Sequence, residues 1–389
     1  MAGLATGKGS GGSEPEASGA EVVWVRPEGI EPYRVAVATD PGRALAAAID
    51  TPPAGGLLFV GDSAVEVLHG AAVRRAFGAP DAPWLTFPPG EASKTRKTVA
   101  RLQDEALAAG IDRDTTVVAV GGGVSTDIGG FVAATLLRGL RWIAAPTTLL
   151  GAVDAAIGGK TGVDTPVGKN LIGTFHHPAA VLAATDLPAT LPPRERLTGW
   201  AEVIKHGVVA DRDLFDWLDR LVAARAGDLA AWWDPDAAVR PVARSVAVKA
   251  AVVSEDPFER GRRAILNFGH TVGHALEAAA AWSISHGEAV AVGMVCEARM
   301  AADIGVLAED DRERIVDLVA AAGLPVRTPA FRAADVMDAM RSDKKRRAGE
   351  LRFALPTAIG EVRRTSGAYT RPVPEQVVQR ALVEAGCSA

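Results

Sequence analysis

The sequence predicts an α/β domain with a mostly parallel sheet, followed by a mainly α-helical domain. Between Tyr33 and about Thr185, short runs rich in β-branched residues alternate with Ala-, Leu- and Arg-rich segments of helical length. Such alternation is typical of a parallel sheet covered by helices. After Leu187 the strand pattern nearly vanishes and helical patterns follow one another. A chain of 389 residues is long enough for two domains, at roughly 100–200 residues each.

The expected elements follow from these patterns. We expect strands over Arg34–Thr39, Gly56–Val60, Trp84–Phe87, Thr115–Val120 and Arg141–Ala145. We expect helices over Ser93–Ala109, Glu195–Val209, Asp213–Ala224, Ala237–Val253, Thr271–Ala281, Glu288–Ile304 and Asp310–Ala322. A short β-like pair, Leu351–Ala354 with Ile359–Arg363, follows near the end. The Leu191-Pro192-Pro193 segment marks the boundary, so we expect the α/β domain over residues 21–190 and the helical domain over residues 191–389.

Composition and charge exclude several classes of protein. With a net charge of −5 the chain has no basic excess that would indicate binding to nucleic acid or to an anionic membrane. No run of about 18 apolar residues is present, so we expect no membrane span. Cys296 and Cys387 are the only cysteines, which offers neither a disulfide framework nor a cysteine zinc site. Residues 1–20 lack an apolar segment, so we expect a disordered tail rather than a secretory signal, and a cytoplasmic location.

The first motif with chemical content is Gly121-Gly122-Gly123-Val124-Ser125-Thr126-Asp127-Ile128-Gly129-Gly130, directly after a predicted strand. Glycines in such a turn let the backbone approach a pyrophosphate, and the next helix offers N–H groups and a positive dipole end. The alternative is a turn that needs glycine for geometry alone. The strand–turn–helix order favours a nucleotide and a Rossmann-like sheet, although the motif is neither G-x-G-x-x-G nor a Walker A loop.

Two upstream features fit a dinucleotide. Asp62 follows a predicted strand, where a carboxylate can bind ribose hydroxyls. The segment Pro88-Pro89-Gly90-Glu91 leads into Ser93-Lys94-Thr95, a turn with paired charges and a helix cap. For each feature alone, a plain N-cap or a surface ion pair is an equal alternative.

The second region contains residues typical of metal ligands. They lie in Ala201-Glu202-Val203-Ile204-Lys205, in Asn267-Phe268-Gly269-His270-Thr271-Val272-Gly273-His274 and in His286-Gly287-Glu288. Two imidazoles and one carboxylate form a common catalytic zinc set with an open position. Thr271 replaces the glutamate of H-E-x-x-H, which disfavours a metalloprotease. The clustering of three histidines makes independent surface or core positions the weaker alternative, and spacing leaves open whether His274 binds the ion or acts as an acid or base.

Cations and amides recur beside these motifs. Thr147-Thr148 and Asp154 precede Gly158-Gly159-Lys160-Thr161-Gly162, and Gly168-Lys169-Asn170 follows. Further cations are Lys205, Lys249, Arg262, Arg263, Lys344 and Lys345. Lysine and arginine suit phosphate and carboxylate groups, although any single one is more often a solvated surface charge. The glycines around Lys160 and Lys169 indicate tight loops that present cations into a cleft between the two halves.

Taken together, these segments resemble the 3-dehydroquinate synthase family of the sugar phosphate cyclase superfamily. The resemblance runs from about Tyr33 to about Ala381 and leaves the N-terminal tail unmatched. Its most specific segments are Pro146–Leu150 with Asp154 and Gly158–Thr161, then Gly168–Gly173, Ala201–Lys205 and Asn267–Thr271.

The resemblance implies a role for each candidate residue. The divalent metal, zinc or cobalt, would be bound by Glu202, His270 and His286. NAD would be held by Asp62, Glu91, Lys94, Gly122, Gly123, Asp127, Thr147 and Thr148. The substrate carboxylate would meet Lys249 and Arg263, and its phosphate would meet Lys160, Asn170, Asn267 and one of Lys344 or Lys345. Arg138 would reach the substrate of a second subunit, which implies a homodimer. Hydroxyls, water and proton transfers would be handled by Asp154, Lys160, Lys169, Lys205, Glu259 and His274.

The implied activity converts 3-deoxy-D-arabino-heptulosonate 7-phosphate to 3-dehydroquinate and phosphate, a step of the shikimate route to aromatic amino acids. NAD would oxidise the hydroxyl at C5 with help from the metal. The ketone would acidify the adjacent C–H, so that phosphate is eliminated and can itself accept the proton. Return of the hydride, ring opening and an intramolecular aldol step would complete the reaction. Closure of the domains over the substrate is expected.

Three alternatives stay open. Other sugar phosphate cyclases make aminodehydroquinate, valiolone or deoxyinosose, and the last two use substrates without a carboxylate, so Lys249 with Arg263 favours a sugar acid. A metal-dependent polyol dehydrogenase shares the glycine turn, but it would release NADH stoichiometrically and needs no anion contacts at Lys160 or Lys169. A catalytically silent NAD- or metal-binding protein is disfavoured because the ligands and active-site lysines are present.

One residue departs from the family pattern. Thr126 stands before Asp127 where the family usually has glycine. A β-branched residue disfavours a positive φ and adds bulk beside the expected pyrophosphate. We expect NAD to bind with a modest local adjustment.

Overall fold

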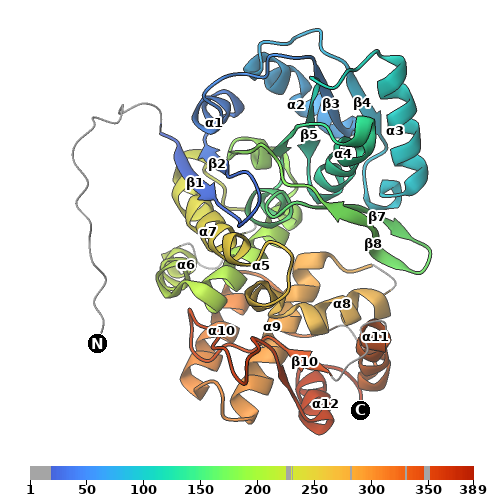
Figure 1. Ribbon diagram of the computed structural model, residues 1–389. Helices are drawn as coiled ribbons and strands as arrows, with labels where there is room; N and C mark the ends of the chain where they lie inside the picture. Colours follow the sequence, from blue (N-terminus) through green and yellow to red (C-terminus); the bar gives the residue numbers. More distant parts are fainter. Residues whose placement is uncertain (1–18, 225–228, 230, 281–282, 329–330, 346–350) are drawn as a thin grey trace.

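The computed structural model describes residues 19–224, 229, 231–280, 283–328, 331–345 and 351–389, with the backbone alone for 342–345. The first half forms a seven-stranded sheet in the order β1-β2-β9-β6-β5-β3-β4 (Figure 1). Its strands are β1 (Glu21–Val25), β2 (Tyr33–Ala38), β3 (Leu57–Asp62), β4 (Trp84–Phe87), β5 (Thr116–Gly121), β6 (Trp142–Pro146) and β9 (Ala180–Ala184). Neighbouring strands run parallel except β1, which is antiparallel to β2. The predicted mostly parallel sheet is confirmed.

Helices cover both faces of this sheet. One face packs against α1 (Pro41–Ala48) and α2 (Ser63–Ala76), and the other against α3 (Arg96–Ala108), α4 (Gly123–Thr135) and α7 (Pro235–Glu255). Residues of β2 alternate between the two faces, so that Val35 and Ala36 belong to two separate buried clusters. Because both faces are buried, the strands are apolar throughout. The sheet is therefore the middle layer of three.

The strand order reverses next to β3. The chain goes from β3 to β4 on one side and then to β5 on the other side of β3. The connections that leave the carboxyl ends of β3 and β5 therefore diverge, and in open α/β sheets ligands bind at such a switch point. Asp62 ends β3 and Gly121 ends β5, so the fold brings two of the predicted nucleotide segments to this place.

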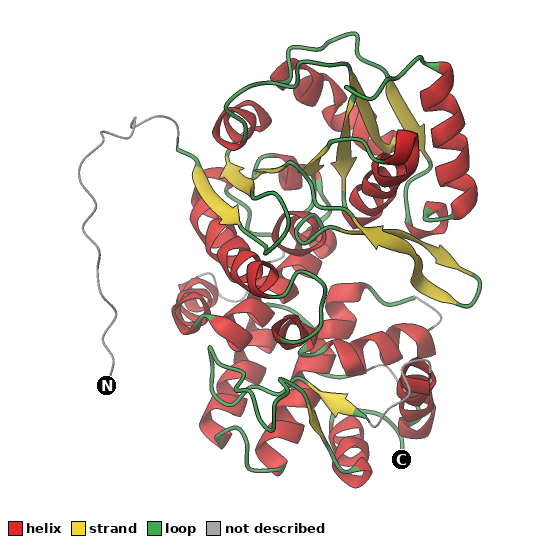
Figure 2. Ribbon diagram, in the orientation of Figure 1, coloured by secondary structure: helices red, strands yellow, loops and turns green. Residues whose placement is uncertain are grey.

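The second half is mainly helical (Figure 2). Its helices, besides α7, are α5 (Pro193–Ala210), α6 (Arg212–Ala224), α8 (His270–Ala279), α9 (His286–Asp303), α10 (Glu309–Ala321), α11 (Ala333–Lys345) and α12 (Glu375–Glu384). One cluster of buried apolar side chains extends from the sheet into these helices, including Val35 and Trp200. The apolar core is thus continuous across residue 190, and the domain boundary stays a prediction.

Two predictions of local structure were wrong. The segment Ile359–Arg363 does not pair with residues 351–354, because β10 (Arg352–Phe353) pairs with β11 (Arg371–Pro372) instead. The segments around Lys160 and Gly168, expected as tight loops, begin the two strands of an antiparallel hairpin, β7 (Lys160–Thr165) and β8 (Gly168–Phe175). The glycines and polar residues of these segments have a low preference for strands. That preference is weak, and pairing between the two strands outweighs it.

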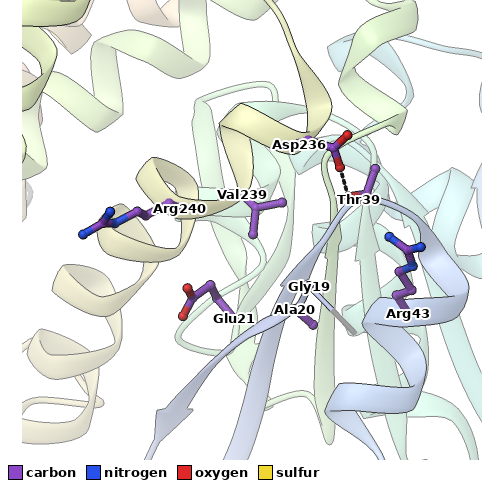
Figure 3. Close-up of a pocket in the computed structure, with 8 residues that line it drawn as sticks. All are labelled: Gly19, Ala20, Glu21, Thr39, Arg43, Asp236, Val239 and Arg240. Carbon is purple, nitrogen blue, oxygen red and sulfur yellow. Dashed lines mark hydrogen bonds between the residues drawn. The ribbon is translucent and has the colours of Figure 1, made fainter. Parts of the chain in front are cut away.

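Two further expectations concern the ends and the surface. The predicted disordered tail, residues 1–20, falls outside the described residues except for Gly19 and Ala20. Among the described helices, none is long and apolar enough to cross a bilayer. An open hollow of about 320 Å³ lies where α1 and α7 begin, beside the hydrogen bond from Thr39 to Asp236 (Figure 3). None of the predicted site residues lines this hollow.

Candidate active site

The glycine turn after β5 leaves no room for side chains. Gly121 has a φ of 139°, and a Cβ there would lie 2.3 Å from Ser125 Oγ. A Cβ on Gly122 would lie 3.1 Å from Thr148 Cγ2. Gly122 is the N-cap of α4 and offers no side-chain cap, which leaves the first-turn amides to an outside acceptor. The turn has the geometry of a phosphate-binding helix start.

Asp62 faces this turn from the end of β3. Its Oδ1 accepts a hydrogen bond from Val65 N at 2.9 Å and so caps α2. Its Oδ2 lies 3.5 Å from Ser125 Oγ, beyond the turn. The N-cap interpretation is confirmed. Binding of ribose hydroxyls by the same carboxylate, which stands at the switch point, stays a prediction.

Thr126 does not strain the turn. It lies inside α4 and is absent from the described residues with positive φ. Its hydroxyl donates to Gly123 O at 3.0 Å, and the residue is buried. The side chain is thus held within the helix, and the expected conflict with a positive φ does not arise.

A cluster of charges lies beside the turn. The buried Lys94 has its Nζ 2.5 Å from Asp127 Oδ2, and it donates to Asn170 Oδ1 at 2.5 Å. Glu91 Oε1 lies 3.9 Å from Nζ of both Lys94 and Lys169. Burial disfavours the ammonium, but Asp127 and Glu91 hold the pKa of Lys94 above its usual value. Lys94, Asp127 and Glu91 are brought together as expected for NAD, and Asn170, expected at the substrate phosphate, joins them.

Asn170 owes its position to an irregularity of the hairpin. The register of β7 and β8 shifts between Val163 and Thr165, and Asn170 has a φ of 56°. Asparagine tolerates this left-handed conformation better than most residues. Its N–H donates to Asp164 Oδ1 at 2.8 Å. The bulge thereby turns the Asn170 amide towards Lys94.

The predicted metal ligands converge from three helices. Glu202 comes from the middle of α5, and His270 and His286 are the first residues of α8 and α9. Nε2 of His270 lies 3.4 Å from Glu202 Oε1, and Nε2 of His286 lies 3.5 Å from the same oxygen. One ligand atom from each of the three lies within 4.8 Å of the others. The family resemblance implied these three residues, and the packing of α8 on α9 and α5 on α9 brings them together.

These residues fit a divalent ion. Glu202 is fully buried, and its Oε1 has no hydrogen-bond partner within the described part of the chain. Its Oε2 accepts from Lys205. Burial opposes the carboxylate, yet Lys205 and His270 hold the pKa of Glu202 well below its usual value. Burial and Lys205 lower the pKa of His270, which keeps the imidazole neutral, as a metal ligand must be. An anionic oxygen without a donor, facing two imidazole nitrogens, is what a cation would satisfy.

The second nitrogen of each imidazole has its own partner. His270 Nδ1 lies 3.2 Å from Phe268 O, and His286 Nδ1 lies 3.3 Å from Glu277 Oε2. Such contacts fix the tautomer that leaves Nε2 for the ion. Glu277 was missed by the sequence reasoning, although its place three residues after His274 was a signal, because i and i+3 share a helix face. His274 is exposed, with its ring 5.3 Å from that of His270.

A second group of charges lies around the π-helix Gly151–Ala155. Asp154 Oδ1 accepts from Lys249 Nζ at 2.5 Å. Burial, opposed by Asp154, lowers the pKa of Lys249 to about 8. Arg263 is buried and donates to Gly158 O at 3.2 Å and to Pro257 O at 2.8 Å. A Cβ on Gly158 would lie 2.4 Å from Arg263 Nη2. Glycine at this position therefore leaves the space that the guanidinium occupies.

Lys160 belongs to a third group. Its ammonium pairs with Glu259, whose φ of 58° is left-handed, and Asn267 Nδ2 lies 3.4 Å from the same carboxylate. Burial opposes ionisation of Glu259, but Lys160 outweighs it and lowers the pKa of the carboxyl. A partly buried acid held in a strained conformation is a common feature of functional sites.

Comparison with known proteins supports one family. The N-terminal model of 3-dehydroquinate synthase matches residues 84–198, and the C-terminal model matches residues 199–346. The chain belongs to the 3-dehydroquinate synthase family. A curated 3-dehydroquinate synthase from Synechococcus sp. is 47% identical over 300 residues, which are 77% of this chain and 79% of that protein.

Solved structures of sugar phosphate cyclases share the fold. A 2-deoxy-scyllo-inosose synthase complexed with carbaglucose-6-phosphate, NAD⁺ and Co²⁺ superposes with a TM-score of 0.83 at 26% identity, covering 94% of this chain and 100% of that one. A 2-epi-5-epi-valiolone synthase from Streptomyces hygroscopicus, with NAD⁺ and Zn²⁺ bound, superposes with a TM-score of 0.80 at 30% identity. The match covers 92% of this chain and 97% of that one. Membership in the 3-dehydroquinate synthase family disfavours the polyol dehydrogenase and the catalytically silent alternatives.

One predicted substrate contact, Arg138, lies apart from these groups. Arg138 is exposed in the turn after α4, where both Leu137 and Arg138 have positive φ. The C-terminal end of α4 is at the opposite end of that helix from the glycine turn, so Arg138 does not join the site of its own chain. The side chains of Lys344 and Lys345 lie outside the described residues.

Proposed function

We propose that this chain converts 3-deoxy-D-arabino-heptulosonate 7-phosphate to 3-dehydroquinate and inorganic phosphate, with catalytic NAD and a divalent ion. The observation that carries the choice of substrate is the pair of buried cations, Lys249 and Arg263, beside the metal set. A carboxylate is the substrate group that suits two buried cations, one of them a forked guanidinium. Substrates of the deoxyinosose and valiolone type lack that carboxylate.

The position of the expected cofactor residues in the fold supports their assignment. NAD would lie over Gly122 and Gly123, with Asp62 at the ribose and Thr147 and Thr148 beside the turn. Lys94, Asp127 and Glu91 form the charged side of the same place. The metal would be held by Glu202, His270 and His286. When bound, NAD supplies a hydride acceptor that is regenerated within each turnover, and the ion polarises the hydroxyl that is oxidised.

Residues of the chain then orient the substrate. Lys249 and Arg263 would fix the carboxylate, and Lys160, Asn267 and Asn170 would hold the phosphate, with Lys344 or Lys345 completing the set. Asp154, Lys205 and Lys169 would hold hydroxyls and water in place. The lysines are held by carboxylates: Lys169 pairs with Glu277, Lys205 with Glu202 and Lys249 with Asp154. A bound substrate would exchange some of those pairs for its own anions.

Proton movements can be assigned to few groups. The leaving phosphate can accept the proton from the carbon next to the ketone, while the electron pair of that C–H bond forms the double bond as the C–O bond to phosphate breaks. His274, exposed near His270 and His286, is placed to exchange protons with solvent. Glu259 would orient Lys160 at the departing phosphate.

A homodimer is part of the proposal. Arg138 is exposed and lies two residues before Leu140, whose carbonyl oxygen contacts His176 Nε2 at 2.9 Å at the end of β8. Phe175 at this end of β8, and Leu171 further along the strand towards the turn, are exposed apolar residues. Exposed apolar side chains near an arginine in a strained conformation support a second subunit on this surface. The two cysteines are buried and free, which fits the reducing cytoplasm as the location.

The test is release of inorganic phosphate from 3-deoxy-D-arabino-heptulosonate 7-phosphate with NAD and zinc, before and after chelation. We expect chelator-sensitive release without net NADH. Stoichiometric NADH would indicate a polyol dehydrogenase. No release, with metal and NAD shown to be bound, would indicate a sister cyclase, and the amino analogue and carboxylate-free sugar phosphates would then be tried.

A further inference from the structure

The imidazole of His286 stands between two carboxylates. Its Nε2 lies 3.5 Å from Glu202 Oε1, and its Nδ1 lies 3.3 Å from Glu277 Oε2. An imidazole gives a metal ion one nitrogen, so one carboxylate can share the ion while the other orients the ring. Both carboxylates belong to groups that could bind a metal. The ligand atoms of His274, Glu277 and His286 lie within 4.8 Å of one another, as do those of Glu202, His270 and His286.

The surroundings decide which side takes the ion. Nε2 of His270 lies 3.4 Å from the same Glu202 oxygen, and that buried oxygen has no hydrogen-bond partner in the described part of the chain. Glu277 instead has the ammonium of Lys169 3.4 Å from its Oε1. A fixed positive charge at that distance repels a second cation. The ion therefore belongs on the Glu202 side.

We propose that Glu277 is the positioning residue of the metal centre. Its carboxylate accepts the Nδ1–H of His286 and leaves the Nε2 lone pair directed at the ion. Glu277 is 3% exposed, and a buried anionic acceptor raises the basicity of the ligand as well as fixing the ring. This inference rests on the metal set of the proposed function and adds a residue outside it.

Lys169 gives Glu277 a second role. Lys169 lies on β8 in the sheet half of the chain, whereas Glu277 lies on α8 in the helical half, next to the hairpin (Figure 1). The ion pair is therefore a link between the hairpin and the metal centre. Through Glu91, 3.9 Å from Lys169, the link continues to the charges beside the glycine turn.

The experiment is a cobalt(II) titration of the metal-free full-length chain against a competing chelator, with the visible absorption of cobalt as a second readout. For Glu277→Gln we expect affinity weaker by about 10–100-fold and a changed absorption band, because the imidazole is less firmly oriented. Glu288→Gln is the matched control. It makes the same substitution at the start of α9, keeps an acceptor for the Ser285 N–H and loses only the exposed pair with Arg194. Its affinity and band should match the parent chain.

Unchanged affinity and spectrum in Glu277→Gln would overturn the proposal. If that variant does not fold, Glu277→Asp carries the same expectation, since it keeps the charge for Lys169 but shortens the reach to Nδ1. Lys169→Met should retain the cobalt affinity; a loss as large as that of Glu277→Gln would assign the effect to the hairpin link and overturn the orienting role.

His270→Ala separates this inference from the proposal on which it rests. If His270→Ala binds cobalt(II) like the parent chain, the metal set itself is wrong and the role of Glu277 falls with it. If His270→Ala loses the ion while Glu277→Gln does not, only the role of Glu277 is overturned. Neither result depends on turnover.

Discussion

The two ends of the site are built in different ways. At the carboxyl edge of the sheet, the nucleotide end consists of one contiguous turn, Gly121–Gly123, faced by Asp62. At the helical end, Glu202, His270 and His286 come from three separate helices. The nucleotide end would bind its ligand through backbone groups of the glycine turn. The helical end would bind its ligand through side chains from segments far apart in the sequence.

Their electrostatics differ as well. Beside the glycine turn, the charges of the buried Lys94 and the partly buried Asp127 neutralise each other at 2.5 Å. At the metal end, Lys205 pairs with one oxygen of Glu202, and the other oxygen has no donor among the described residues. A buried acceptor without a donor costs about 1–3 kcal/mol. A cation would therefore satisfy a buried acceptor at the helical end, whereas the charged side chains beside the glycine turn already pair with each other.

This contrast predicts different sensitivities. The metal end should lose its ion when a ligand side chain is removed. The nucleotide end should lose NAD affinity when a side chain is added to the glycine turn.

The largest effect is expected for His270→Ala. Loss of one of three ligands should remove the ion and reduce phosphate release by more than about 100-fold, since even outer contacts of a metal site cost 10–100-fold. Metal content and phosphate release measure this. His274→Ala is the comparison. That variant should retain the ion, and its rate of phosphate release should fall by about 10²–10⁴-fold if His274 exchanges protons. Full metal content and a normal rate in His270→Ala would contradict the ligand assignment.

Gly121→Ala should break the nucleotide end. The added Cβ meets Ser125 Oγ at 2.3 Å, and the φ of 139° is one that alanine rarely adopts. We expect a cost of about 1–3 kcal/mol in unfolding free energy from the backbone strain, with weaker NAD binding. Gly123→Ala is the matched control for stability alone, since its Cβ would meet Ala155 Cβ at 3.4 Å, an ordinary contact. Thermal unfolding compares the two variants, and equal stability would refute a sterically closed turn at Gly121. NAD titration of Gly121→Ala against the parent chain measures the loss of binding.

Lys249, which is buried and pairs with Asp154, should give the reaction a pH limit. Its pKa is lowered to about 8, mainly by burial, so the ammonium is charged below that pH and lost above it. We expect kcat/KM to fall by up to about tenfold per pH unit above this value. Lys249→Arg should move the limit upward; an unchanged profile would exclude Lys249 as its source.

The same pKa shift has a consequence for stability. Between about 8 and the ordinary value of 10.5, the unfolded chain holds the Lys249 proton more tightly than the folded chain does. The contribution of this group to the unfolding free energy therefore rises with pH across that window. Denaturant titrations of the parent chain and Lys249→Arg should differ there, with the arginine variant lacking the rise.

The smallest effect is expected for Thr126→Gly, which restores the family residue. Thr126 is a helical residue whose hydroxyl bonds to Gly123 O. Glycine in a helix interior costs about 1 kcal/mol, so thermal unfolding should occur at a lower temperature while NAD affinity stays the same. Tighter NAD binding in Thr126→Gly would show that Thr126 does crowd the pyrophosphate.

Part of the fold was predictable because its signal is local. The apolar run Thr116–Gly121 followed by glycines gave the strand, the turn and the start of α4. The hairpin β7–β8 was not predictable, because its glycines and polar residues are stabilised by pairing with each other rather than by their own preferences. For the same reason the partner of β10 was assigned to the wrong segment.

The sequence was enough to propose candidate residues, namely the glycine turn and the cations from residue type and local context, and the Glu–His–His set from motifs that resemble a family. Which of these groups meet depends on the tertiary structure. It paired Lys94 with Asn170, and Lys249 with Asp154, and it placed Glu277 behind His286. Such contacts join segments far apart in the chain, and their geometry is set by helix and strand packing, which no local pattern encodes.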